Sequence, residues 1–256
     1  MIYVTGDTHA RFSKFNTDHF PEQKEMTKDD FVIVCGDFGG VWNFSGCTNQ
    51  ERYWLDWFDE KPFTLLFVDG NHENFDRLLN DYPVVDFHGG KAHQISKTVF
   101  HLMRGYVFDL DDQKVFAFGG ASSHDIQDGI LDVNNYPTIN SMIKDYNWRT
   151  AAGQMIRINH ISWWAEELPS REEMNRGIKE LEKVDFNVDF VVSHSLPQNA
   201  AAAAGFLSPD AVTLYFDKLV NQYGLKFKRW FSGHYHKDED VLGKYTIKYH
   251  DIEQIV

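Results

Sequence analysis

Residues 64–75 read Thr-Leu-Leu-Phe-Val-Asp-Gly-Asn-His-Glu-Asn-Phe. The apolar run at 65–68 ends in Asp69-Gly70-Asn71-His72-Glu73, a turn with one glycine and several polar side chains. A buried strand that ends in such a turn predicts a binding site, because α/β proteins collect ligands at the carboxyl ends of their strands. This stretch therefore predicts a strand of a buried sheet and one wall of a site.

The same arrangement occurs four more times along the chain. In each case a short apolar run precedes a polar turn: Gly6-Asp7-Thr8-His9 after 2–5, Cys35-Gly36-Asp37 after 31–34, Ser193-His194 after 190–192, and Ser232-Gly233-His234-Tyr235-His236 after 227–231. Parallel strands bring their carboxyl ends to one edge of a sheet, so we expect these turns to converge. The pattern predicts one site built from nearly the whole chain.

Bulk composition restricts the class of protein. The 256 residues are 43% hydrophobic, which is enough for one α/β domain with a sizeable core. The net charge of −13 argues against broad binding to nucleic acid or anionic lipid, but it leaves room for a local positive site built by metal ions. Cys35 and Cys47 are too few for a disulfide framework or a cysteine-based zinc site. The chain starts directly on a predicted strand without a basic or long apolar leader, so we expect a cytoplasmic protein with no membrane segment.

The segments between the turns predict the remaining elements. Helices are expected at 50–60, 75–81, 170–184, 200–204 and 208–223, strands at 84–87, 98–102, 106–110 and 115–118, and a hairpin at 241–256. Ser170 and Glu173 predict a capping box, and Pro209 is expected in the first turn of its helix. Residues 119–165 show no clear period. We interpret them as an insertion, and possible lid, within a single domain of residues 1–256.

Seven side chains at the strand ends are candidate metal ligands: Asp7, His9, Asp37, Asn71, His194, His234 and His236. Oxygen and imidazole donors in this mixture suit Mn, Fe or Zn better than Ca or Cu(I). The Asp-x-His and His-x-His spacings put two donors on one turn, where both can face one ion. A single histidine is more often structural, and His93, His101 and His160 receive that interpretation.

In their order along the chain, the motifs D-x-H, G-D, G-N-H-[ED], H and G-H-x-H resemble those of the calcineurin-like metallophosphoesterases, and they span residues 6–236. The resemblance implies an α/β (α+β) fold, a four-layer α-β-β-α sandwich of two mixed sheets flanked by helices. It also implies two divalent metal ions. Asp7, His9 and His236 would bind one ion, Asn71, His194 and His234 the other, and Asp37 would bridge them.

The activity that this resemblance implies is hydrolysis of a phosphate mono- or diester. A hydroxide bridging the two metals would attack, and His72 would serve as general acid or as a clamp on the phosphoryl oxygen. The ions would be Mn, Fe or Zn, with Mn expected in vitro. Two positions depart from the family pattern. Gly40 stands where many relatives carry an acid that orients the catalytic histidine, and Ala10 where many have glycine. The partner of His72 therefore stays open.

The substrate is not named by the sequence. We expect a small phosphorylated molecule or a phosphoprotein, since the acidic composition disfavours long nucleic acids. His124 and Arg104 are candidate substrate contacts, with Asp125 and Arg149 as further candidates near the opening. The main alternative is a non-catalytic protein-binding scaffold on the same fold. A nucleotide-binding α/β domain is disfavoured because G-x-G-x-x-G and G-x-x-x-x-G-K-[ST] are both missing.

Overall fold

The computed structural model describes residues 1–256, and most of its strands belong to two large mixed sheets. In the first sheet, the central strands run parallel and the outer ones antiparallel. Its seven strands are, in spatial order, β15 (Glu253–Gln254), β1 (Ile2–Thr5), β2 (Phe31–Val34), β3 (Thr64–Phe67), β6 (Val99–Leu102), β5 (Gly90–Gln94) and β4 (Val84–Phe87).

The second sheet repeats this plan with a parallel centre and antiparallel edges. Its six strands are, in spatial order, β13 (Glu239–Val241), β14 (Tyr245–Ile247), β12 (Arg229–Ser232), β11 (Phe190–Ser193), β8 (Gln113–Phe118) and β7 (Tyr106–Leu110). The predicted hairpin at 241–256 is wrong in part. Only β13 and β14 pair with each other, while β15 crosses to the first sheet and pairs with β1.

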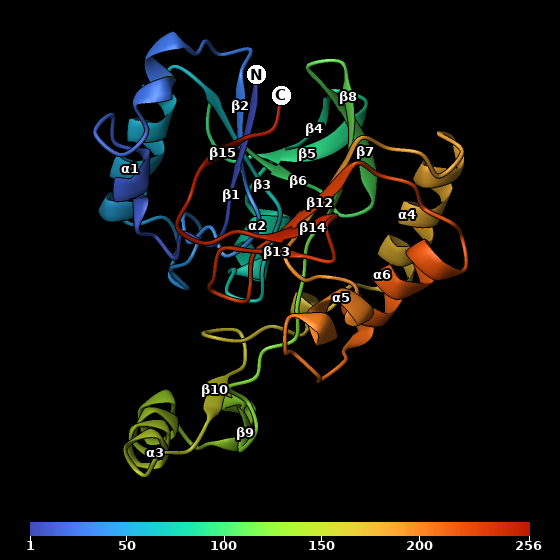
Figure 1. Ribbon diagram of the computed structural model, residues 1–256. Coiled ribbons are helices and arrows are strands. Elements are labelled where there is room, and N and C mark those ends of the chain that lie inside the picture. Colours follow the sequence, from blue (N-terminus) through green and yellow to red (C-terminus); the bar gives the residue numbers. More distant parts are fainter.

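Apolar side chains hold four layers together, which confirms the predicted sandwich (Figure 1). Along β2, Val32 and Val34 belong to the core on the outer face of the first sheet, whereas Ile33 packs between the two sheets with Val192. This alternation follows from the period of two along a strand that is buried on both faces. The helices on the outer faces are α1 (Asn49–Asp59) on the first sheet and α4 (Arg171–Glu182), α5 (Gln198–Ala203) and α6 (Ala211–Asn221) on the second.

Helix ends mostly follow the predicted capping chemistry. The Ser170–Glu173 capping box is confirmed at the start of α4. The predicted start of α6 is wrong, because Asp210 caps this helix through a 2.8 Å bond from the Thr213 N–H and Pro209 lies outside it. A carboxylate at the N-cap satisfies a free amide, which proline cannot do. The short helix α2 (Phe75–Asn80) follows the Asn71-His72 turn, as expected.

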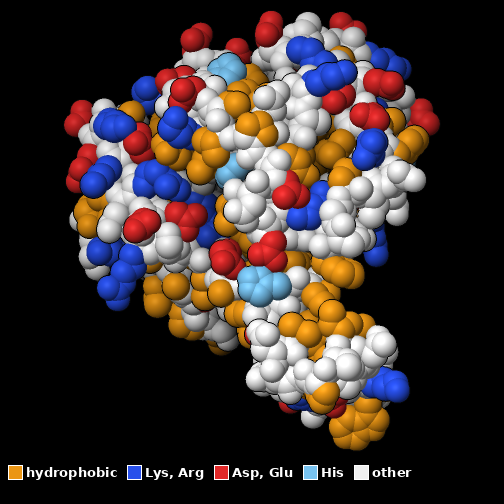
Figure 2. All heavy atoms as spheres, turned by 180° about the vertical axis from the view of Figure 1, so that it is seen from behind, with side chains coloured by type: hydrophobic (Ala, Val, Ile, Leu, Met, Phe, Trp, Pro, Cys, Tyr) orange, Lys and Arg blue, Asp and Glu red, His pale blue; other side chains and the backbone are white.

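The segment 119–165 contains a small unit of its own. It comprises β9 (Gly129–Leu131), α3 (Ile139–Ala151) and β10 (Ile156–Ile158), with β9 and β10 paired in parallel. Four buried residues form its core: Leu131, Met142, Ile156 and Ile158. The unit extends from the body as a lobe with apolar side chains on its surface (Figures 1 and 2). No helix of this protein combines the length and the apolar composition that crossing a membrane requires.

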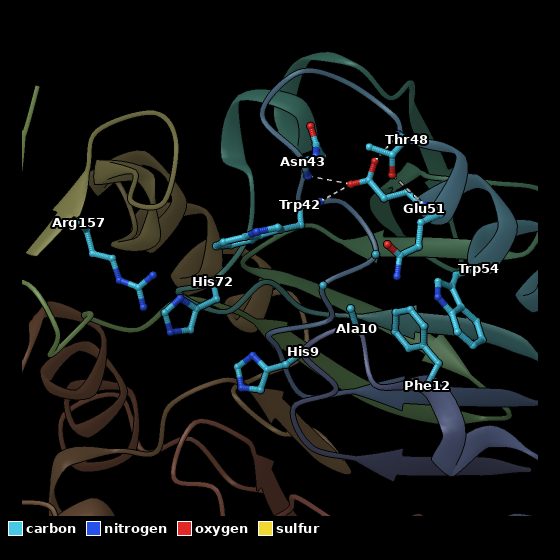
Figure 3. A pocket seen from close by; sticks show the side chains of 13 residues that line it. His9, Ala10, Phe12, Trp42, Asn43, Thr48, Glu51, Trp54, His72 and Arg157 are labelled. Carbon is cyan, nitrogen blue, oxygen red and sulfur yellow. Dashed lines mark hydrogen bonds between the residues drawn. The ribbon is translucent and has the colours of Figure 1, made fainter. Parts of the chain in front are cut away.

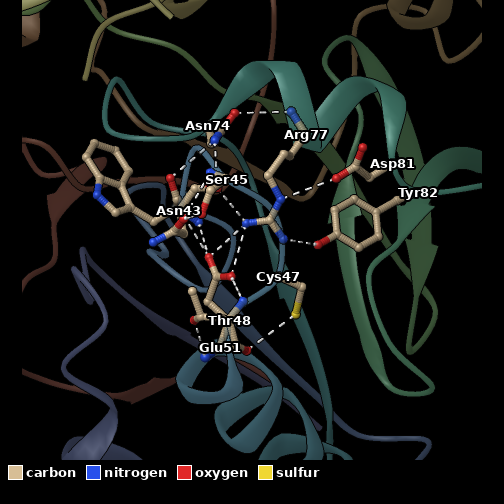
Figure 4. Close-up of polar contacts among 10 residues, drawn as sticks. Asn43, Ser45, Cys47, Thr48, Glu51, Asn74, Arg77, Asp81 and Tyr82 are labelled. Atoms are coloured by element: carbon tan, nitrogen blue, oxygen red, sulfur yellow. Dashed lines mark hydrogen bonds and ion pairs between the residues drawn. The ribbon is translucent and has the colours of Figure 1, made fainter. Parts of the chain in front are cut away.

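A buried ion pair holds the loop between β2 and α1, which forms one wall of a cavity (Figure 3). Glu51 Oε1 accepts the N–H groups of Trp42 and Asn43, each at 2.8 Å, and lies 2.9 Å from Arg77 Nη1 (Figure 4). Its other oxygen accepts the Thr48 N–H and completes the cap of α1. One carboxylate therefore ties the start of α1 to α2 and fixes the loop between β2 and α1.

We predict that Arg77→Ala lowers the free energy of unfolding by about 3–5 kcal/mol, because it leaves the Glu51 carboxylate buried without its charged partner. Chemical denaturation followed by circular dichroism measures this change. Lys91→Ala is the matched control, since it removes an ion pair to Asp86 that lies on the surface, and it should leave the denaturation midpoint almost unchanged. Equal midpoints for Arg77→Ala and the wild type would contradict this role.

Candidate metal centre

The five predicted turns lie together at the carboxyl ends of two sets of adjacent parallel strands. β1, β2 and β3 are neighbours in the first sheet, and β11 and β12 are neighbours in the second. The turns after these strands carry, in the same order, Asp7 with His9, Asp37, Asn71, His194, and His234 with His236. The structure therefore brings donors from both sheets to one edge of the sandwich.

Both carboxylates use one oxygen for a backbone amide of a neighbouring turn. Asp7 Oδ1 accepts the His234 N–H at 2.8 Å, and Asp37 Oδ1 accepts the His72 N–H at 2.7 Å. Two glycines permit this approach, since a Cβ at Gly70 would lie 2.0 Å from Asp37 Oδ1 and one at Gly233 would lie 2.1 Å from Asp7 Oδ1. The second oxygen of each carboxylate stays available to the centre.

One group of donors has the spacing of a single metal site. Asp7 Oδ2 lies 3.1 Å from His236 Nε2 and 3.6 Å from His9 Nε2, and the two ring nitrogens are 3.0 Å apart. Ligands about 2.1 Å from one ion are separated by about 3.0–3.4 Å, so two of the three separations lie in the expected range and the third is slightly longer. Asp7 Oδ2 is also buried and accepts no hydrogen bond, since the contact with His236 Nε2 lacks hydrogen-bond geometry. A divalent cation would satisfy this oxygen.

A second group lies beside the first. His194 Nδ1 donates to the Cys35 carbonyl at 2.8 Å, which leaves Nε2 free to bind a cation, 3.2 Å from Asn71 Oδ1 and 3.5 Å from Asp37 Oδ2. The ring of His234 lies beside His194, with centroids 4.9 Å apart. The same Asp37 Oδ2 is 3.8 Å from His9 Nε2. It therefore lies between the two groups, where the family resemblance places a bridging ligand.

The electrostatics of the centre also fit cations. Burial alone would lower the pKa of His194, but the Asp37 and Asp7 carboxylates outweigh it and raise that pKa to about 10. Burial opposes ionisation of Asp37 as well, yet the nearby imidazoles, His194 first, hold its pKa below the usual range. The pocket thus attracts positive charge. A divalent ion would replace the proton on His194, as metals do at imidazole ligands.

Four candidate ligands adopt the left-handed backbone conformation that favours glycine. They are His9 (φ 44°), Asp37 (49°), His234 (68°) and His236 (51°). Each such conformation costs on the order of 1–3 kcal/mol and persists only where surrounding structure enforces it. The hydrogen bonds between neighbouring turns stabilise these backbone conformations. The conformations in turn direct the donor side chains toward a common centre.

Two residues that the sequence analysis did not select orient Asn71. Asn71 Nδ2 donates to Ser123 Oγ at 3.2 Å, and that hydroxyl donates to Glu167 Oε2 at 2.6 Å. Because the amide nitrogen is held there, Asn71 Oδ1 faces His194 and the centre. Ser123 lies in the polar loop after β8, so its position after a strand was the one sequence signal that could have indicated it.

His72 borders the cavity next to the metal centre rather than lying within the ligand groups. Its ring centroid is 5.8 Å from that of His9 and 6.3 Å from Trp42. Burial lowers the pKa of His72, while the Asp37 and Asp125 carboxylates oppose this shift. Gly40 supplies no acid, and the charged neighbour of His72 that the family pattern did not predict is Asp125, from the loop after β8.

The candidate substrate contacts have different surroundings. His124 is exposed and its ring lies 5.1 Å from that of His234, next to the centre. Arg104 is buried, with Nε 2.8 Å from Asp69 Oδ2, and it lines a separate cavity that contains none of the candidate ligands. Arg149 bonds to Gln154 and to the Asp128 carbonyl within the lobe. These contacts give Arg104 and Arg149 structural roles.

Comparison with known proteins agrees with the geometry. A sequence model of the family described as calcineurin-like phosphoesterase matches residues 1–238. The chain belongs to the calcineurin-like phosphoesterase family. Together with the donor groups, this membership indicates a site for metal ions at this edge of the sandwich.

Curated proteins and solved structures show little similarity to the chain. No curated protein matches the chain. Among solved structures, a Staphylococcus aureus protein provisionally named a 5'-nucleotidase, crystallised with alpha-ketoglutarate, is similar with a TM-score of 0.43 and 14% identity. The match covers 97% of this chain and 48% of that one, so the chain spans about half the length of this structure.

We predict that Ser123→Ala weakens Mn²⁺ binding by about 10–100-fold, because the Asn71 amide loses the contact that orients it. Competition with a coloured chelator measures the dissociation constant. Ser122→Ala is the matched control, since only the backbone N–H of Ser122 bonds to Asp210 and its hydroxyl has no role in the centre. Equal affinities in Ser123→Ala and Ser122→Ala would show that Ser123 does not orient Asn71.

Proposed function

We propose that this protein hydrolyses phosphate esters at a centre of two divalent metal ions. The observation that supports this most directly is the convergence of two donor groups from five strand ends, with one oxygen of Asp37 between them and the His234 ring beside His194. In this proposal Asp7, His9 and His236 hold one ion and Asn71, His194 and His234 the other. Mn²⁺ is the ion we expect to support activity in vitro.

The protein's own residues have three tasks in this reaction. The bound ions supply Lewis acidity and lower the pKa of a water molecule. Asp37 and Asp7 fix the spacing of the two groups through their backbone hydrogen bonds. Four neutral imidazoles and an amide among the ligands keep the centre cationic, so that it attracts a phosphoryl group in a protein of net charge −13.

His72 is the residue we propose as general acid for the leaving group. It lies beside the ligand groups, lines the cavity with His9, and has its backbone fixed by Asp37. A proton on its ring would reach a leaving oxygen that points into the cavity. The substrate we propose is a small phosphorylated molecule or a phosphoprotein in the cytoplasm, approached from the side of the lobe.

Replacing His72 tests this role. His72→Ala should lower kcat for phenyl phosphate, whose leaving oxygen needs a proton, by about 10²–10⁴-fold, the range for loss of a general acid, without changing Mn²⁺ content. Elemental analysis and steady-state kinetics measure the two quantities. His19→Ala, which removes an exposed histidine, is the control. A variant that keeps the wild-type kcat would contradict the assignment of His72.

The pH profile distinguishes a general acid from a clamp. Only the imidazolium form donates a proton, so wild-type kcat should fall as pH rises through the pKa of His72, which burial lowers below its ordinary value. His72→Ala should lack that alkaline limb. If the limb persists in His72→Ala, another group donates the proton and His72 serves as a clamp.

The scaffold alternative predicts a different result. A metal-loaded protein that turns over no phosphomonoester, phosphodiester, nucleotide or phosphopeptide would favour a protein-binding role on the same fold. Retention of every candidate ligand argues for the enzyme.

A further inference from the structure

The cavity beside the metal centre has walls from two parts of the chain. It has a volume of about 400 Å³, and the body contributes His9 and His72 together with an apolar wall that includes Trp42 and Trp54. Arg157 comes from the lobe, and its guanidinium points toward His72 in Figure 3. Among the 13 lining residues Arg157 is the only lysine or arginine. The single carboxylate, Glu51, is already neutralised by Arg77.

The fold of the lobe dictates that Arg157 faces the cavity. Arg157 is the middle residue of the three-residue strand β10, and its neighbours Ile156 and Ile158 are buried in the small core of the lobe. Because successive side chains on a strand point to opposite faces, Arg157 points away from that core. Its side chain is 24% exposed, so it is reachable from the cavity.

Asp125 binds one edge of the Arg157 guanidinium and leaves the other edge unbound. Arg157 Nε donates to Asp125 Oδ2 at 2.8 Å, and Nη2 contacts the same oxygen. Nη1 has no hydrogen-bond partner in the protein, and Asp125 Oδ1 is buried without one. One edge of the fork is therefore held in place while the other edge is available to an anion.

The chain that leaves β10 is fixed to the body a few residues later. His160 Nδ1 lies 2.9 Å from Asp76 Oδ2, and Trp164 Nε1 donates to the same oxygen at 2.8 Å. The ring of Trp164 packs edge-on against Trp42, which lines the cavity. These contacts join the base of the lobe to α2, next to the His72 turn, so Arg157 is presented by an anchored segment.

We propose that Arg157 is a specificity-determining residue that binds a non-bridging oxygen of the substrate phosphoryl group and favours phosphomonoesters over phosphodiesters. The inference rests on the proposed function of the same site. A guanidinium fork matches the geometry of phosphate oxygens. A monoester carries a charge of about −1.5 to −2 at neutral pH, whereas a diester carries one. The contact therefore favours the more anionic oxygens of a monoester, although Asp125 offsets part of the charge of Arg157.

The test uses the full-length, Mn²⁺-loaded protein and two independent readouts. Calorimetric titration with inorganic phosphate should show binding about 10–100-fold weaker in Arg157→Gln than in the wild type, because a charged hydrogen bond is lost. In steady-state kinetics, the ratio of kcat/KM for p-nitrophenyl phosphate to that for bis(p-nitrophenyl) phosphate should fall about tenfold. Arg157→Lys keeps the charge without the fork and should give intermediate values. Lys144→Gln removes one exposed charge from α3 of the same lobe and should match the wild type.

Each outcome separates the inference from the proposed function. Unchanged phosphate binding in Arg157→Gln overturns the inference, whether or not the enzyme is active, as does a wild type that binds no phosphate. An equal loss of rate on both esters overturns the preference for monoesters. If Arg157→Gln loses phosphate affinity but the wild type hydrolyses neither ester, the anion contact is supported and the hydrolase proposal fails.

Discussion

Two hydrogen bonds that cross from one sheet to the other organise the centre. The His234 amide of the second sheet donates to Asp7 of the first across 227 residues of sequence, and the His194 ring donates to the Cys35 carbonyl across 159. Each bond uses one polar atom and leaves a second one, Asp7 Oδ2 or His194 Nε2, among the candidate ligands at the edge of the sandwich. A buried carboxylate with an unused oxygen is unfavourable unless a cation completes it. The hydrogen bonds that join the two sheets therefore also prepare these two atoms to bind a cation.

A second network of buried charged groups, centred on Asp69, supports the same region. Asp69, the first residue of the turn after β3, lies between Arg104 and His101, 3.0 Å from His101 Nε2, and its carbonyl accepts the Gly120 N–H at 2.9 Å. Burial opposes ionisation of Asp69, but Arg104 holds its pKa well below the usual value. This network fixes the turn that carries Asn71 and His72. It explains why Arg104, a candidate substrate contact, has a structural role.

The metal centre could be predicted from the sequence because the position of each donor follows from the residues directly before it. A strand followed by a glycine and a donor predicts where that donor lies, and five such units agree on one sheet edge. Arg157 could not be found in this way. Its position depends on the strand pairing and small core of a segment whose polar composition shows no period, and on Asp125, thirty-two residues earlier. β15 could not be predicted for the same reason. A strand of two residues shows no alternating pattern, and its partner β1 is far away in the sequence.

The pairing of β15 with β1 has a consequence for how the protein folds. β1 leads directly into Asp7 and His9, yet its outer neighbour is contributed by Glu253–Gln254, and Gln254 pairs with Tyr3 across 251 residues of sequence. Contacts between such distant segments form slowly, because a long loop must close before they are rewarded. We therefore expect the outer edge of β1, and with it the support of the turn that carries Asp7 and His9, to be completed late in folding.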